Sequence, residues 1–108
     1  MTLTWKQGDR DPPLELTLRR DGEPYDLTDR SVRLVIGTTR GTVLVDTSPE
    51  VTDAVNGEIR YDWDAGDLDV RVRTYQVEVV VDEGTDAETT FPNDGYGEIK
   101  ITKELGDE

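Results

Sequence analysis

The residues best suited to chemistry form an acidic cluster in the middle of the chain, made up of Asp62, Asp64, Asp67 and Asp69. Hard cations such as Ca²⁺ bind several carboxylate oxygens at once, so this cluster is a candidate cation site. Its spacing departs from the twelve-residue calcium loop, because a loop that begins at Asp62 puts Arg73 where that loop needs Glu. With 25 acidic residues in the chain, such clusters also arise by chance. We interpret the cluster as a solvated acidic loop, with a structural Ca²⁺ as the alternative and no other cofactor expected.

Other catalytic chemistry finds little support in the sequence. Paired carboxylates hydrolyse glycosides in many enzymes, but among so many acidic residues a suitable pair says nothing specific. The chain contains no His and no Cys. It therefore lacks a His general base, a Ser–His or Cys–His pair, a disulfide and the usual ligands of zinc. Gly95 and Gly97 do not form a phosphate-binding loop. We predict that the protein is not an enzyme.

Three aromatic residues offer a possible binding platform. The rings of Trp5, Tyr61 and Trp63 would stack on the faces of sugars if they were exposed. In an extended strand, however, Tyr61 and Trp63 fall on the same face as Ile59, as core residues do. We therefore favour burial of Tyr61 and Trp63 and packing of Trp5 at a sheet edge over a sugar-binding platform.

The best candidate for a partner-facing loop is the stretch 90–96, Thr-Phe-Pro-Asn-Asp-Gly-Tyr. It carries an aromatic residue near each end on a backbone stiffened by proline, and protein interfaces favour aromatic anchors. A purely structural turn is the alternative for this stretch. The residues predicted to contact a partner are Phe91, Pro92, Asn93, Tyr96 and Trp5.

The formal net charge of −13 is the most unusual global property of this 108-residue chain. Acidic residues number 25 against 12 basic ones, and Lys occurs only at Lys6, Lys100 and Lys103. This composition resembles that of proteins from organisms with molar salt in the cytoplasm. There the Debye length is about 3 Å, so mutual repulsion is screened, and a dense carboxylate surface stays hydrated. We predict a halophilic origin, with an ordinary acidic protein as the alternative.

The charge and hydropathy patterns also exclude several partners. Nucleic acids and anionic membranes are bound by clustered Lys and Arg, which the chain lacks. No stretch approaches the roughly 20 apolar residues of a membrane span. The first residues contain no apolar signal-peptide core, so we expect synthesis in the host cytoplasm without export by that route.

Alternating apolar residues predict the elements that must position these groups. The clearest alternation is 74–82, where Tyr75, Val77, Val79 and Val81 share one face of a central strand. Shorter alternations at 2–6, 14–18, 32–37, 42–46, 58–63, 88–91 and 96–101 are separated by turns such as Asp21-Gly22 and Asn56-Gly57. No run has a helical period. We predict one all-β domain over 1–108, a small antiparallel immunoglobulin-like β-sandwich with an acidic tail at about 103–108. A closed barrel is the alternative.

Several segments in this order resemble the amino-terminal domain of phage baseplate upper proteins. The matching segments are Lys6-Gln-Gly-Asp, Pro13-Leu-Glu-Leu-Thr-Leu, Asp21-Gly-Glu-Pro-Tyr-Asp-Leu-Thr, 32–36, Gly57-Glu-Ile-Arg-Tyr-Asp-Trp, Ala65-Gly-Asp, 75–81 and Thr90-Phe-Pro-Asn-Asp-Gly-Tyr. Each is ordinary strand and turn chemistry, but their order and spacing span nearly the whole chain. The sequence departs from the family at 71–74, where members usually place a Pro-Gly pair before the tyrosine.

The resemblance implies a structural virion protein that joins other virion proteins. Together with the composition, it indicates a tailed virus of a haloarchaeon and a symmetric or multi-copy assembly of this chain. The expected partners are tail, baseplate, adaptor or capsid proteins, in the tail, the baseplate or the head–tail region. The alternatives are capsid-surface decoration, a carbohydrate- or host-surface-binding module, and an acidic cellular protein unrelated to viruses.

Overall fold

The structure is a computed structural model that describes residues 2–38, 41–64, 66–68, 73–91 and 97–102. These residues form strands and turns, and none of them belongs to a helix that could cross a membrane. The strands are β1 (Thr2–Lys6), β2 (Leu14–Thr17), β3 (Arg19–Arg20), β4 (Glu23–Pro24), β5 (Val32–Gly37), β6 (Val43–Thr47), β7 (Glu50–Asp53), β8 (Glu58–Tyr61), β9 (Arg73–Val81), β10 (Thr89–Phe91) and β11 (Gly97–Thr102). The predicted all-β class is confirmed.

The larger sheet is built around β9, the strand with the clearest alternation in the sequence. Its strand order is β1-β11-β9-β5-β6. On one side β9 pairs with β5, and on the other it pairs with β11 at its start and β10 at its end. Along β9, buried residues from Tyr75 to Val81 alternate with half-buried ones, as the pattern predicts. Strands β5 and β6 form an antiparallel hairpin, and so do β9 and β10.

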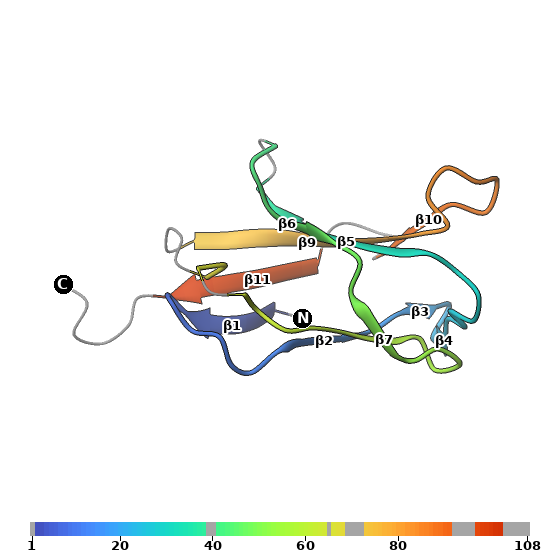
Figure 1. Cartoon of the computed structure of the whole chain (residues 1–108), viewed down its shortest axis with the longest axis horizontal. Helices are drawn as coiled ribbons and strands as arrows, with labels where there is room; N and C mark the ends of the chain where they lie inside the picture. The colour runs from blue at the N-terminus through green and yellow to red at the C-terminus, as the bar shows by residue number, and fades with distance from the viewer. Residues whose placement is uncertain (1, 39–40, 65, 69–72, 92–96, 103–108) are drawn as a thin grey trace.

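Strands β1 and β11, which come first and last along the chain, pair in parallel. This pairing corrects the prediction of a purely antiparallel fold. Leu3 of β1 lies opposite Ile99 of β11, and Trp5 lies opposite Ile101. Figure 1 shows β1 in blue beside β11 in red. Two strands that are not joined by a short turn are free to run in either direction, and hydrophobic alternation carries no information about that direction.

The smaller sheet has the order β2-β8-β7, and the short hairpin β3–β4 follows β2. The hairpin turns at Asp21 and Gly22, whose φ angles are +54° and +84°. Positive φ at both central residues is what a tight turn between twisted strands requires. The prediction of a turn at this pair is confirmed.

One hydrophobic core joins the two sheets. Its buried side chains come from the inward faces of both, and among the described residues no polar or charged side chain is buried. Leu34, Val81 and Ile101 are completely covered, and Leu27, in the connection between β4 and β5, is also buried. The remaining buried members are Trp5, Leu14, Leu18, Val32, Ile36, Val45, Ile59, Trp63, Leu68, Tyr75, Val77, Val79, Phe91 and Ile99.

Candidate docking site

The two tryptophans form a buried structural cluster. Trp5 and Trp63 are only 5% and 3% exposed, and their rings meet edge to face at 5.2 Å between centroids. Both indole N–H groups donate to the backbone carbonyl of Pro12, over 2.7 Å from Trp5 and 3.1 Å from Trp63. Tyr61 packs against Trp63 with its ring also edge to face. Neither tryptophan is available as a sugar-stacking platform in this arrangement.

Two of the five residues predicted to contact a partner, Trp5 and Phe91, lie in the part of the chain that the structure describes. Phe91, at the end of β10, is 4% exposed and packs against the ring of Tyr25. Trp5 is equally part of the core, so neither aromatic side chain offers the exposed anchor that the sequence indicated. Each lies on the inward face of its strand, and burial in the core competes with display to a partner. Pro92, Asn93 and Tyr96 lie outside the described residues.

The acidic cluster is divided among separate structural contacts. Asp62 forms an ion pair with Arg60 at 2.9 Å, and Asp67 accepts hydrogen bonds from the hydroxyl of Tyr61 (2.5 Å) and the backbone N–H of Asp64 (2.8 Å). Asp69 lies outside the described residues. Within the described part of the chain, no three acidic side chains converge in the way that a cation needs. Asp67 has a visible structural role, which is to hold Tyr61 and close a turn.

Tyr61 should resist ionisation because of this contact. Burial first, and then the hydrogen bond to Asp67, raise the pKa of the Tyr61 phenol well above its ordinary value. The pKa of Tyr61 is therefore higher in the folded protein than in the unfolded chain, where it is about 10. The folded state is favoured fully below about pH 10, and this contribution to the free energy of unfolding is lost as the pH rises further. We predict that Asp67→Asn lowers the pKa of Tyr61 toward its ordinary value, since a negative charge is removed while burial remains.

Ultraviolet absorbance of the phenolate during an alkaline titration measures this change. Asp62→Asn is the matched control, because Asp62 pairs with Arg60 and leaves the phenol of Tyr61 untouched. An unchanged Tyr61 titration in Asp67→Asn would show that the hydrogen bond to Asp67 does not influence the phenol.

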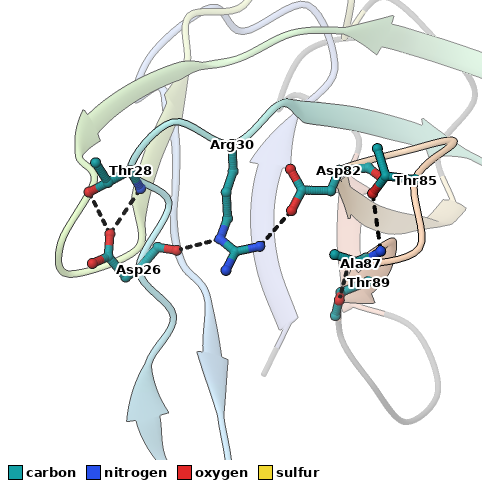
Figure 2. A network of polar contacts seen from close by, with 7 residues as sticks. All are labelled: Asp26, Thr28, Arg30, Asp82, Thr85, Ala87 and Thr89. Atoms are coloured by element: carbon teal, nitrogen blue, oxygen red, sulfur yellow. Dashed lines mark hydrogen bonds and ion pairs between the residues drawn. The ribbon is translucent and has the colours of Figure 1, made fainter.

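An arginine ties the connection between β4 and β5 to the end of β9 (Figure 2). Arg30 donates to the backbone carbonyl of Asp26 at 3.1 Å and pairs with Asp82 at 2.5 Å. Its guanidinium also lies over the ring of Tyr25, 5.1 Å from the centroid. Asp26 in turn accepts hydrogen bonds from both the backbone N–H and the hydroxyl of Thr28, which lower the pKa of its carboxyl. This network fixes the loops at one end of the molecule.

A second arginine lies on the outer face of the larger sheet. Arg33 of β5 makes a two-pronged contact with Asp46 of β6, at 2.8 and 2.6 Å, and pairs with Glu83 after β9 at 2.6 Å. The hydrogen bonds from Arg33 hold the pKa of the Asp46 carboxyl below its ordinary value. Direct ion pairs of this kind survive in high salt better than long-range attraction does.

A groove of about 540 Å³ lies between the two sheets. One wall is the whole of β2 with its continuation, residues 14–19, and the other comes from β1, β9, β10 and β11. The floor is apolar, and the polar residues at the groove are Glu15, Thr17, Arg19 and Glu98. The apolar lining residues are Leu3, Leu14, Leu16, Leu18, Val77, Val79, Phe91 and Ile99.

Beside this groove, β2 is an edge strand of the smaller sheet. It pairs with β8 on one side, and no described strand pairs with its other side. An unpaired edge presents backbone N–H and C=O groups that can join another strand. The sequence indicated β2 itself but not this edge, because alternation assigns residues to a face of a sheet and does not reveal which strands lie outermost.

The comparisons with known proteins identify the family of the chain. A search of curated proteins found no match to the chain. The family model described as the BppU N-terminal domain matches residues 3–92, which includes β1 to β10 apart from the first residue of β1. BppU is the baseplate upper protein, so this family describes a structural domain of the phage baseplate, and a structural role in the virion follows. The chain belongs to the BppU N-terminal domain family.

Proposed function

We propose that the protein is a non-enzymatic structural component of the tail or baseplate of a tailed virus, which acts by docking onto other virion proteins. The family match over residues 3–92 carries this proposal. The groove and the unpaired edge of β2 support it, because both are features that a protein partner can use. The buried positions of Trp5 and Trp63 make a carbohydrate-binding role less favourable than docking.

We also propose an immunoglobulin-like β-sandwich as the fold. The order β11-β9-β5-β6 in one sheet and β2-β8-β7 in the other corresponds to strands G-F-C-C′ and B-E-D of the variable type. The single core shared by both sheets supports the same assignment. In such domains the faces, edges and end loops are the usual places of contact with partners.

The host would be a haloarchaeon, and the charge supports this proposal. At a net charge of −13, self-repulsion should destabilise the compact state when salt is removed. We predict that the melting temperature of the isolated domain falls on dilution from molar salt to about 0.1 M, where the Debye length grows to about 10 Å. Replacing the exposed acids Glu23 and Asp86 by Gln and Asn should reduce this fall. A melting temperature that rises or stays constant on dilution contradicts the halophilic assignment.

The copy number of the chain in purified particles tests the docking role. Particles are isolated in high salt, and the mass and stoichiometry of the chain are measured by quantitative mass spectrometry before and after dilution into low salt. We expect a fixed copy number that reflects a symmetric assembly, and release together with tail or baseplate fragments. Absence of the chain from purified particles would contradict the proposal.

A further inference from the structure

We propose that the free edge of β2 and the adjoining groove bind an extended segment of another virion protein, which adds a fourth strand to the smaller sheet. The segment alternates apolar and polar residues and carries Lys or Arg opposite Glu15. This inference rests on the proposed docking function and deepens it by assigning the surface and the chemistry of the partner.

The backbone N–H and C=O groups on the free side of β2 can pair with an added strand. Leu14, Leu16 and Thr17 lie opposite Tyr61, Ile59 and Glu58 of β8, and the N–H of Leu18 continues the ladder by donating to Gly57 at 2.8 Å. In an antiparallel ladder, hydrogen-bonded pairs alternate with non-hydrogen-bonded ones. The backbone groups of Leu14, Leu16 and Leu18 therefore point toward β8, and those of Glu15 and Thr17 point outward.

The groove gives an added strand a place for its apolar side chains. Residues that lie opposite one another on paired strands point to the same face of a sheet. A partner residue opposite Leu16 would therefore point inward, into the groove lined by side chains such as Val77, Phe91 and Ile99. Backbone hydrogen bonds give affinity in this mode of recognition, and pockets for alternate side chains give specificity.

The other edge of the smaller sheet is less suited to accept a strand. Strand β7 shifts register against β8 between Val51 and Asp53. The outer strand β6 of the larger sheet likewise shifts register against β5, between Ile36 and Gly37. Irregularities of this kind twist an edge and discourage further pairing. Strand β2, by contrast, pairs with β8 in a regular register along its whole length.

Charges on the outer face of the smaller sheet indicate the partner's chemistry. Arg60 of β8 lies between Glu15 of β2 and Glu50 of β7, and this row alternates in sign across the sheet. A Lys or Arg opposite Glu15 continues the alternation, and opposite charges stabilise cross-strand pairs.

A second copy of this chain fits the edge poorly. If two β2 edges paired about a twofold axis through Leu16, Glu15 would lie opposite Thr17 of the other copy. The two Glu15 carboxylates would then share one face at a diagonal separation of about 7–8 Å between backbones.

Photo-crosslinking in assembled particles tests the site. A benzoylphenylalanine replaces Thr17 at the edge or, as a control, the exposed Ser48 in the loop between β6 and β7. After irradiation, mass spectrometry identifies the crosslinked peptide. We expect position 17 to crosslink to one segment of another virion protein that alternates apolar and polar residues with a Lys or Arg, and position 48 not to reach that segment.

A binding measurement with a synthetic peptide of the crosslinked segment then tests the backbone pairing. Thr17→Pro removes the outward N–H and leaves the ladder with β8 intact, so it should weaken binding about tenfold, as expected for one unmade buried hydrogen bond. Thr17→Val keeps that N–H and should bind as the unmodified chain does. Equal binding by both variants would overturn the proposal.

The crosslinking outcomes separate this inference from the function on which it rests. If the chain is present at fixed copy number but position 17 crosslinks only to a second copy, or to nothing, the edge proposal is wrong and the docking function stands. If the chain is absent from particles, the docking function itself is wrong.

Discussion

Gly57→Ala is expected to lower the free energy of unfolding by about 3 kcal/mol, because the substitution combines backbone strain with overpacking. Gly57 has a φ of +69°, which disfavours any side chain. A methyl group there would lie 2.6 Å from the carbonyl oxygen of Tyr25 and 2.7 Å from that of Leu18. These backbone atoms cannot move independently, since Tyr25 donates to Leu18 and Leu18 donates to Gly57. Chemical denaturation in high salt measures the loss.

Gly84→Ala is the matched control for this prediction. Gly84 has a similar φ of +83°, but a methyl group there meets nothing within 4 Å. The control should therefore show the strain of the left-handed conformation alone, about 1 kcal/mol. Equal losses of unfolding free energy in the two variants would mean that the carbonyl oxygens of Leu18 and Tyr25 do not crowd a methyl group at position 57.

Trp63→Ala is expected to lower the free energy of unfolding by about 3–5 kcal/mol, as large aromatic truncations in cores do. The variant loses the ring contacts with Trp5 and Tyr61 as well as the hydrogen bond to Pro12. The residual fluorescence of Trp5 reports unfolding in this variant, because the chain has only two tryptophans. Val55→Ala, at a side chain that is 64% exposed, should change stability by less than about 0.5 kcal/mol.

The two tryptophans donate to the same carbonyl, that of Pro12, so single and double variants test whether their hydrogen bonds are coupled. In Trp63→Phe the carbonyl of Pro12 keeps the hydrogen bond from Trp5, and in Trp5→Phe it keeps the one from Trp63. We expect each single variant to be mild and the double variant to lose more than the sum, since only then is the carbonyl left without its indole partners. Strict additivity would show that the two hydrogen bonds act independently.

Local chemistry made the strands and turns predictable from the sequence. The alternation from Tyr75 to Val81 identifies β9 and its buried face, because period-two burial is a property of a single strand. Asp21-Gly22 marks the β3–β4 turn because few residue pairs accept positive φ at both positions. The core positions of Ile59 and Trp63 follow from the same reasoning.

Contacts between distant parts of the chain were not predictable from the sequence, because they depend on which strands become neighbours. The parallel pairing of β1 with β11 joins the two ends of the chain, and no local pattern encodes it. The groove arises from the separation of β2 and the larger sheet, and the contact of Arg33 with Glu83 spans 50 residues. Phe91 was expected at an interface because aromatic anchors and core aromatics look alike in sequence, and the structure places it in the core.

Electron microscopy of purified particles labelled with an antibody fragment against this chain locates the protein on the particle and so tests its proposed place in the tail or baseplate. We expect label on the tail or baseplate, at a constant number per particle, and lost together with tail or baseplate fragments in low salt. Label spread over the capsid would contradict a tail or baseplate position and would favour surface decoration instead.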